Sequence, residues 1–158
     1  YKHFPLTLTI SKTRKMEGLN FIAIAVAALI PSIMGFIWYN SKVFGTVWMQ
    51  ETGITEEKAK QNNMALVFGL TLVLSFLLSF FMFVTVNIGG PDDMRHGTEA
   101  YSTFKHGAFH GVFMGILVAI PMIFINGLFE QKSFKYMFIN VGYWTVCFAL
   151  MGGLLCAW

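Results

Sequence analysis

The stretch MALVFGLTLVLSFLLSFFMFVTVNI, residues 64–88, contains no charged side chain, and it decides the fold class. A helix of about 20 apolar residues is long enough to cross the hydrocarbon core of a bilayer. Three similar stretches, at residues 19–39, 107–129 and 134–158, also carry no Asp, Glu, Lys or Arg in their interiors. Lipid offers the backbone no hydrogen-bond partner, so each stretch is predicted to be helical. We therefore predict an all-α integral membrane protein, a bundle of four transmembrane helices.

The composition of the chain agrees with a membrane location. Of its 158 residues, 56% are hydrophobic and 12% are charged, whereas a soluble domain carries about 25% charged residues. So few charges cannot cover a water-exposed surface, so much of the surface must face lipid. The net charge of +3 indicates helix ends that meet anionic lipid head groups, and no nucleic-acid partner.

The links between the stretches complete the architecture. Residues 41–49 are amphipathic enough to form a short interfacial helix between spans one and two. Gly53 should end that helix, and Thr55 should cap a new helix that runs on into span two. Residues 16–158 form the membrane domain, and residues 1–15 are either a basic tail or residues added to the native protein. If Met16 is the first native residue, the positive-inside rule places both termini outside the cytoplasm.

Small residues recur at every fourth position in the last two stretches. Such residues allow helices to approach closely in lipid, where no hydrophobic force drives helices together. The pattern indicates a glycine zipper inside a compact bundle, or alternatively the interface of a homo-oligomer. The residues that we expect to make this packing contact are Gly107, Gly111, Gly115, Ala119, Ala149 and Gly153.

Two histidines at the start of the third stretch are the candidate metal ligands. His106 and His110 are four residues apart, so their side chains project from the same face of a helix. Two imidazoles at this spacing can hold a metal ion, and Asp92, Asp93 and His96 in the preceding loop could complete its ligands. The alternative is that the histidines meet lipid phosphates or water, or hydrogen-bond to a neighbouring helix. The sequence requires no cofactor, and this metal is the candidate that it offers.

Three further polar residues lie inside the last two stretches. Asn126, Asn140 and Tyr143 are predicted either to join helices by hydrogen bonds or to line a pocket for a small ligand or a lipid. We assign no catalytic residue, because the sequence contains no nucleophile elbow, phosphate loop or dinucleotide fingerprint.

Several short motifs resemble one family of small membrane proteins. They are Pro31 with GFIWY at 35–39, FG at 44–45, WM at 48–49, NGLFE at 126–130, INVGYW at 139–144 and MGG at 151–153. Together they are similar to an uncharacterised bacterial family, domain of unknown function 1761. FKHG at 104–107 with HG at 110–111 resembles its Bacteroidetes-type members. The resemblance implies a four-span protein of the bacterial cytoplasmic membrane and implies no activity.

Three hypotheses for the function follow. The first is a non-enzymatic module of the bilayer that self-associates or serves as an accessory to a membrane-protein partner. The second is a metal- or cofactor-binding membrane protein centred on His106 and His110. The third is a bundle that binds a small ligand or a lipid.

Overall fold

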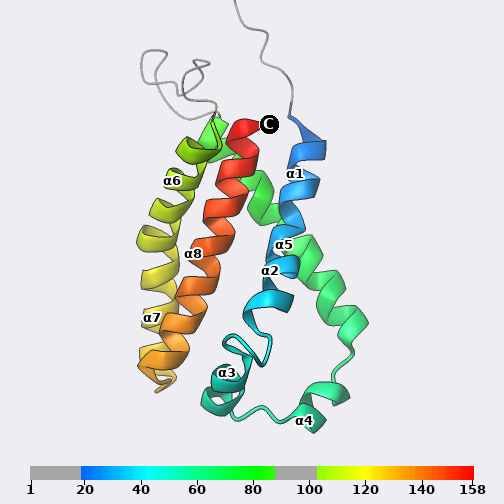
Figure 1. The fold of residues 1–158 in the computed structure, drawn as a ribbon, viewed down its shortest axis with the longest axis vertical. Helices are drawn as coiled ribbons and strands as arrows, with labels where there is room; N and C mark the ends of the chain where they lie inside the picture. Colours follow the sequence, from blue (N-terminus) through cyan, green and yellow to red (C-terminus); the bar gives the residue numbers. More distant parts are fainter. Residues whose placement is uncertain (1–18, 88–102) are drawn as a thin grey trace, which may run out of the picture.

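A computed structural model describes residues 19–87 and 103–158 of the chain. Within these residues every regular element is a helix, and there is no strand. Four segments are long and apolar enough to cross a membrane (Figure 1), namely Phe21–Trp38, Met64–Thr85, Phe104–Phe129 and Phe134–Ala157. The predicted all-α fold with four transmembrane helices is therefore confirmed.

Each of the four spans begins directly after a polar side chain that caps it. The side chains of Asn20, Asn63, Thr103 and Ser133 each accept a hydrogen bond from a backbone N–H three residues further on, over 3.0–3.3 Å. The first N–H groups of a helix have no partner within the helix, so a side-chain acceptor at this position fixes where the helix starts.

Proline interrupts the first span. Helix α1 (Phe21–Ala28) ends at Leu29, and α2 (Ile30–Trp38) continues from there with Pro31 in its first turn. Proline has no backbone N–H, and its ring crowds the carbonyl four residues earlier. The chain absorbs this as a short break, so the span consists of two helices.

Proline has a related effect on the third span. Here α6 (Phe104–Met114) passes through a wide π-helical turn, η1 (Gly115–Ala119), into α7 (Ile120–Phe129). Pro121 lies in the first turn of α7. The residue four positions before it belongs to η1, and a widened turn relieves the contact between the proline ring and that carbonyl.

The link between spans one and two contains two short helices, α3 (Gly45–Thr52) and α4 (Glu56–Gln61). Gly53 ends α3 in the left-handed conformation, at φ +68°, which glycine adopts without steric strain. Thr55 accepts a hydrogen bond from the backbone N–H of Lys58 at the start of α4.

Two details of the predicted link are wrong. The helix expected over residues 41–49 begins only at Gly45, because residues 41–44 form turns, and it extends to Thr52. We expected the helix that begins after Thr55 to run into span two, but α4 ends at Gln61 and α5 (Met64–Asn87) begins anew. The reason is local. Asn62 and Asn63 separate the two helices, and the Asn63 side chain caps α5, because a short amide competes with the helix for backbone hydrogen bonds.

Helix α8 (Phe134–Ala157) is the centre of the bundle. Half of its membrane-crossing segment is buried, against 28% for the first span and 17% for each of the other two. It contacts α1, α2, α5 and the whole of the third span, which lies along it in Figure 1. By contrast, α5 diverges from α2 towards α4 in the same view. The fold is therefore three spans arranged around one.

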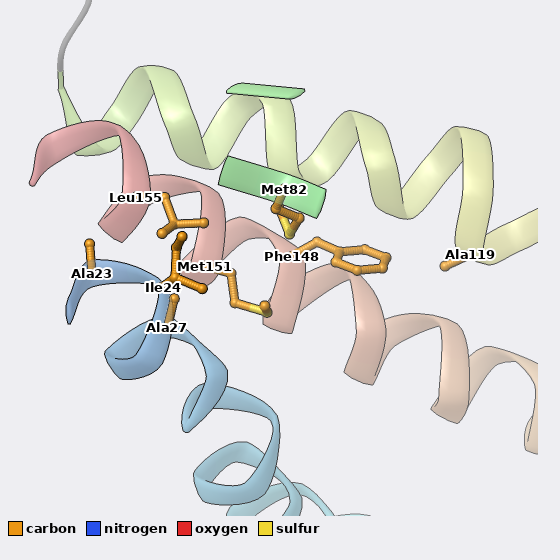
Figure 2. Close-up of a cluster of buried hydrophobic side chains, with 8 residues drawn as sticks. All are labelled: Ala23, Ile24, Ala27, Met82, Ala119, Phe148, Met151 and Leu155. Atoms are coloured by element: carbon orange, nitrogen blue, oxygen red, sulfur yellow. The ribbon is translucent and has the colours of Figure 1, made fainter. Parts of the chain in front are cut away.

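The buried core lies where α1, α5 and α8 cross, as Figure 2 shows. Ile24, Met82 and Met151 are fully buried there. The Ser79 hydroxyl also enters this region and donates a hydrogen bond of 2.8 Å to the carbonyl of Ile24. This bond fixes the height of α5 against α1. The labelled cluster comprises Ala23, Ile24, Ala27, Met82, Ala119, Phe148, Met151 and Leu155.

Among the described helices, α6 and α8 approach each other very closely. A Cβ atom at Gly107 would overlap the carbonyl of Gly152, and a Cβ atom at Gly111 would overlap that of Phe148. At Gly115 the methyl of Thr145 would be 2.8 Å away. A Cβ atom at any of these three places would displace a neighbour; the two backbones touch directly at Gly107 and Gly111, whereas Gly115 in η1 faces the side chain of Thr145. We call this contact the glycine seam.

The remaining small residues that we selected from the sequence lie beside the glycine seam. Ala149 is next to Gly111, and Gly153 packs under the ring of Phe104. Ala119 is buried in the core at the far end of η1.

Candidate functional site

Two groups of polar and aromatic side chains stand out within the four spans. The first lies where the end of α2 meets the start of α8. Tyr39 donates a hydrogen bond of 2.8 Å from its hydroxyl to Oδ1 of Asn140. Asn140 in turn donates from Nδ2 to the carbonyl of Tyr136, and Trp38 donates from Nε1 to the carbonyl of Ile139. Two of these bonds fix the end of α2 to the first turns of α8, and the third holds the Asn140 amide in place within α8.

Tyr143 extends this group towards the middle of the bundle. Its hydroxyl is buried and donates a hydrogen bond of 2.7 Å to the carbonyl of Pro31. Its ring centroid is 5.2 Å from that of Tyr39, which is also 5.2 Å from that of Trp48 in α3. We call Trp38, Tyr39, Trp48, Asn140 and Tyr143 the aromatic–amide cluster.

The buried polar atoms of the aromatic–amide cluster have hydrogen-bond partners within the chain. In the part of the chain that the structure describes, no buried side-chain nitrogen or oxygen lacks a hydrogen-bond partner. Tyr39 follows the last residue of the first span, and burial raises the pKa of its phenol above the usual range, so its hydroxyl stays protonated, and able to donate, in alkaline solution where a free phenol ionises. These features favour a joint between helices over an open ligand pocket.

The structure brings together two of the three polar residues that we grouped from the sequence. Asn140 and Tyr143 both belong to the aromatic–amide cluster. Asn126 is exposed on α7 and takes no part in the hydrogen bonds of that cluster.

The second group is the histidine pair at the start of α6, near the opposite end of α8. Nε2 of His106 lies 3.0 Å from Nε2 of His110, and their ring planes meet at 73°. Both side chains are half-buried. Each histidine directly precedes a glycine of the seam, Gly107 or Gly111, so the packing of α6 on α8 holds the backbone of both residues.

The structure does not assemble a larger set of metal ligands from its described residues. Among residues 19–87 and 103–158, no group of three or more His, Cys, Asp or Glu side chains could hold a metal ion. The other ligands that we suggested, Asp92, Asp93 and His96, lie outside the described residues. The histidine pair is therefore considered on its own geometry.

The sequence did not reveal the partners of the aromatic–amide cluster. Trp and Tyr are common at the ends of membrane spans whatever they contact, so the positions of Trp38 and Tyr39 in the sequence do not single out a partner. Their partners are 101 residues away, and one of them is a backbone carbonyl. One signal could have indicated this contact. Tyr39 at the end of the first span and Asn140 near the start of the fourth lie on the same side of the membrane, and a phenol and an amide can hydrogen-bond.

The fold and these two groups define the class of the molecule, a small helical membrane protein with four segments able to span a bilayer. Residues 22–156 match the model of the family described as protein of unknown function (DUF1761). The match covers most of the chain, so the protein belongs to this family. No curated protein and no solved structure matches the chain.

Proposed function

We propose that the protein is a non-enzymatic module of the bilayer that associates with a second copy of itself through α5. The observation that carries this proposal is Gly69, in the first half of that helix. Among the described glycines of the four spans, it is the one with no atom within 4 Å of the place where a Cβ would lie. No contact among the described residues requires the absence of a side chain at this position.

A glycine inside a helix lowers helix stability by about 1 kcal/mol relative to alanine. In the glycine seam, close contact with α8 compensates for this loss. At Gly69 no contact among the described residues compensates for this loss, and we infer that contact with a second chain does. Ala65 lies one turn earlier and is also exposed, so the two residues form the small-xxx-small pattern found where membrane helices meet.

A hollow next to this face gives a second reason. Leu72 and Phe76 lie three and seven residues after Gly69, on the same face of α5. They line a hollow of about 310 Å³ between α5 and α1, together with Ala25, Val26, Ala28 and Leu29. Every one of these side chains is apolar, and the face carries no charge. A helix of equal apolarity is the partner that such a surface fits.

The test is energy transfer between donor- and acceptor-labelled copies in lipid vesicles, measured at increasing dilution in lipid. We expect wild-type chains to associate and Gly69→Leu to weaken association at least tenfold, because the larger side chain holds the helices apart. Val67→Leu is the matched control, since Val67 is 43% exposed and lies on the opposite face of α5. It should associate as the wild type does.

Two results would contradict the proposal. One is a wild-type chain that is monomeric at every dilution, and the other is a Gly69→Leu variant that associates normally. If isolated chains are monomeric but a larger complex in native membranes is lost in Gly69→Leu, the partner is another membrane protein and not a second copy.

We place the protein in the cytoplasmic membrane of a bacterium. The resemblance of its motifs to the bacterial family supports this location. Fractionation of the native host, with the protein followed by an antibody, tests it.

A further inference from the structure

The histidine pair has the geometry of a chelate for a metal ion. We propose that His106 and His110 bind one divalent late transition-metal ion, best Cu²⁺, through their two Nε2 atoms, with the remaining coordination positions open to water or to a small ligand. This site is separate from the α5 face and does not depend on the proposed self-association.

The distance between the two nitrogens determines which ions fit. Metal–nitrogen bonds to histidine are about 2.0–2.1 Å long. Two nitrogens 3.0 Å apart then subtend an angle of about 91–97° at an ion bonded equally to both. A tetrahedral ion, with an angle of about 109°, would need the nitrogens about 3.3–3.4 Å apart.

An angle near 90° is the one between neighbouring ligands in square-planar and octahedral complexes. Imidazole nitrogens in a square-planar or tetragonal arrangement are typical of Cu²⁺ and Ni²⁺. Cu²⁺ also binds most tightly among the divalent ions of the first transition row. The distance and the ligand type therefore favour the same ion.

The backbone that carries the two imidazoles is already fixed. Gly107 and Gly111 hold the first turns of α6 against α8, and Thr103 caps the backbone N–H of His106. Since the two nitrogens already lie 3.0 Å apart, binding requires the two rings to turn until both Nε2 lone pairs point at the ion, while the backbone stays in place. Their partial exposure gives an ion access to the site.

Two neutral imidazoles can also share a hydrogen bond at this distance, with Nε2 of one donating to Nε2 of the other. Metal binding would replace that proton, because both Nε2 atoms must then be acceptors and the remaining N–H must lie on Nδ1. The hydrogen-bonded form is the metal-free state of the same site, so only a binding experiment separates a chelate from a structural histidine pair.

The experiment uses the full chain, purified in mild detergent through a tag without histidine and stripped of metal with a chelator. CuCl₂ is titrated by calorimetry into the wild type, into His106→Gln and into His110→Gln. We expect one Cu²⁺ per wild-type chain. Each single variant should lose at least tenfold in affinity, because removing either ligand destroys the chelate. Lys105→Gln, an exposed position in the same turn of α6, is the control and should bind as the wild type does.

A spectroscopic measurement on the unaltered sequence guards against variants that fail to fold. Electron paramagnetic resonance of the Cu²⁺ complex should show an axial signal with splitting from two equivalent nitrogens. This splitting should change in protein that carries ¹⁵N-labelled histidine. No stoichiometric binding to the wild type, full binding in both variants, or a spectrum insensitive to ¹⁵N-histidine would each overturn the proposal.

Discussion

Replacing Gly111 by alanine tests the glycine seam, because it adds a single methyl group at the contact between α6 and α8. The added Cβ would overlap the Phe148 carbonyl and lie 2.6 Å from Cα of Ala149. Non-bonded carbon atoms are most stable at about 3.5–4.0 Å, so α6 would have to retreat by about 1 Å. Because α6 is a rigid helix, that movement would also loosen the contacts of Gly107 and Gly115.

The expected loss of stability follows from this overlap. Overpacking a close-packed site by one methyl group typically costs about 1–3 kcal/mol. Alanine is also the better helix former, by about 1 kcal/mol, and this gain partly offsets the loss. Gly69→Ala measures the gain in helix propensity by itself, because a methyl group at this position meets no described neighbour. The difference in stability between the two variants therefore gives the cost of overpacking at Gly111.

The assay is reversible unfolding in mixed detergent micelles, followed by helical circular dichroism at a protein dilution where the chain is monomeric. We expect Gly111→Ala to be less stable than Gly69→Ala by about 1–3 kcal/mol. Equal stability of the two variants would refute the reasoning, because it would show that α6 and α8 are not in backbone contact at Gly111.

Three further predictions concern the polar and buried side chains. Asn140→Leu removes the acceptor of the Tyr39 hydroxyl and should lower stability in the same assay by about 0.5–1.5 kcal/mol; a variant that loses binding of a lipid or small ligand at unchanged stability would favour a pocket instead. Ser79→Ala removes the bond to the Ile24 carbonyl and should cost about 0.6 kcal/mol, the mean for such bonds in membranes; no measurable change would place α5 away from α1. The Cys147 side chain is fully buried, so a maleimide should react with it only after unfolding, and rapid labelling of the native protein would contradict the packing around α8.

The two groups of polar residues lie towards opposite ends of α8. The aromatic–amide cluster joins α8 to the first span near Asn140, and the histidine pair lies beside the C-terminal half of α8, next to the glycine seam. The central helix is therefore fixed at both ends by different means, hydrogen bonds at one and backbone contact at the other. A change in one group should leave the other in place.

The positions of the charged residues along the sequence determined the number of membrane-spanning segments and their helical form. A charge inside hydrocarbon is so unfavourable that uncharged runs of sufficient length identify membrane-crossing helices by themselves. The residues at which helices begin could also be predicted from the sequence, because an N-cap is a local interaction between a side chain and the next turn of the helix. The break between α4 and α5 belongs to this class, and Asn62 with Asn63 was its signal.

The tertiary structure alone decided which helix is central. Lipid tails are as apolar as leucine, so a face that packs against protein and a face that meets lipid have similar compositions. The burial of α8 and the openness of α5 at Gly69 could therefore not be distinguished by hydropathy.

The hydrogen-bond partners were hidden for a related reason. Trp38, Ser79 and Tyr143 donate to the backbone carbonyls of Ile139, Ile24 and Pro31. Every residue has a carbonyl, so nothing in the sequence marks these acceptors. They become specific only when helices that are distant in the chain are packed at a fixed height and rotation, which is a property of the assembled bundle.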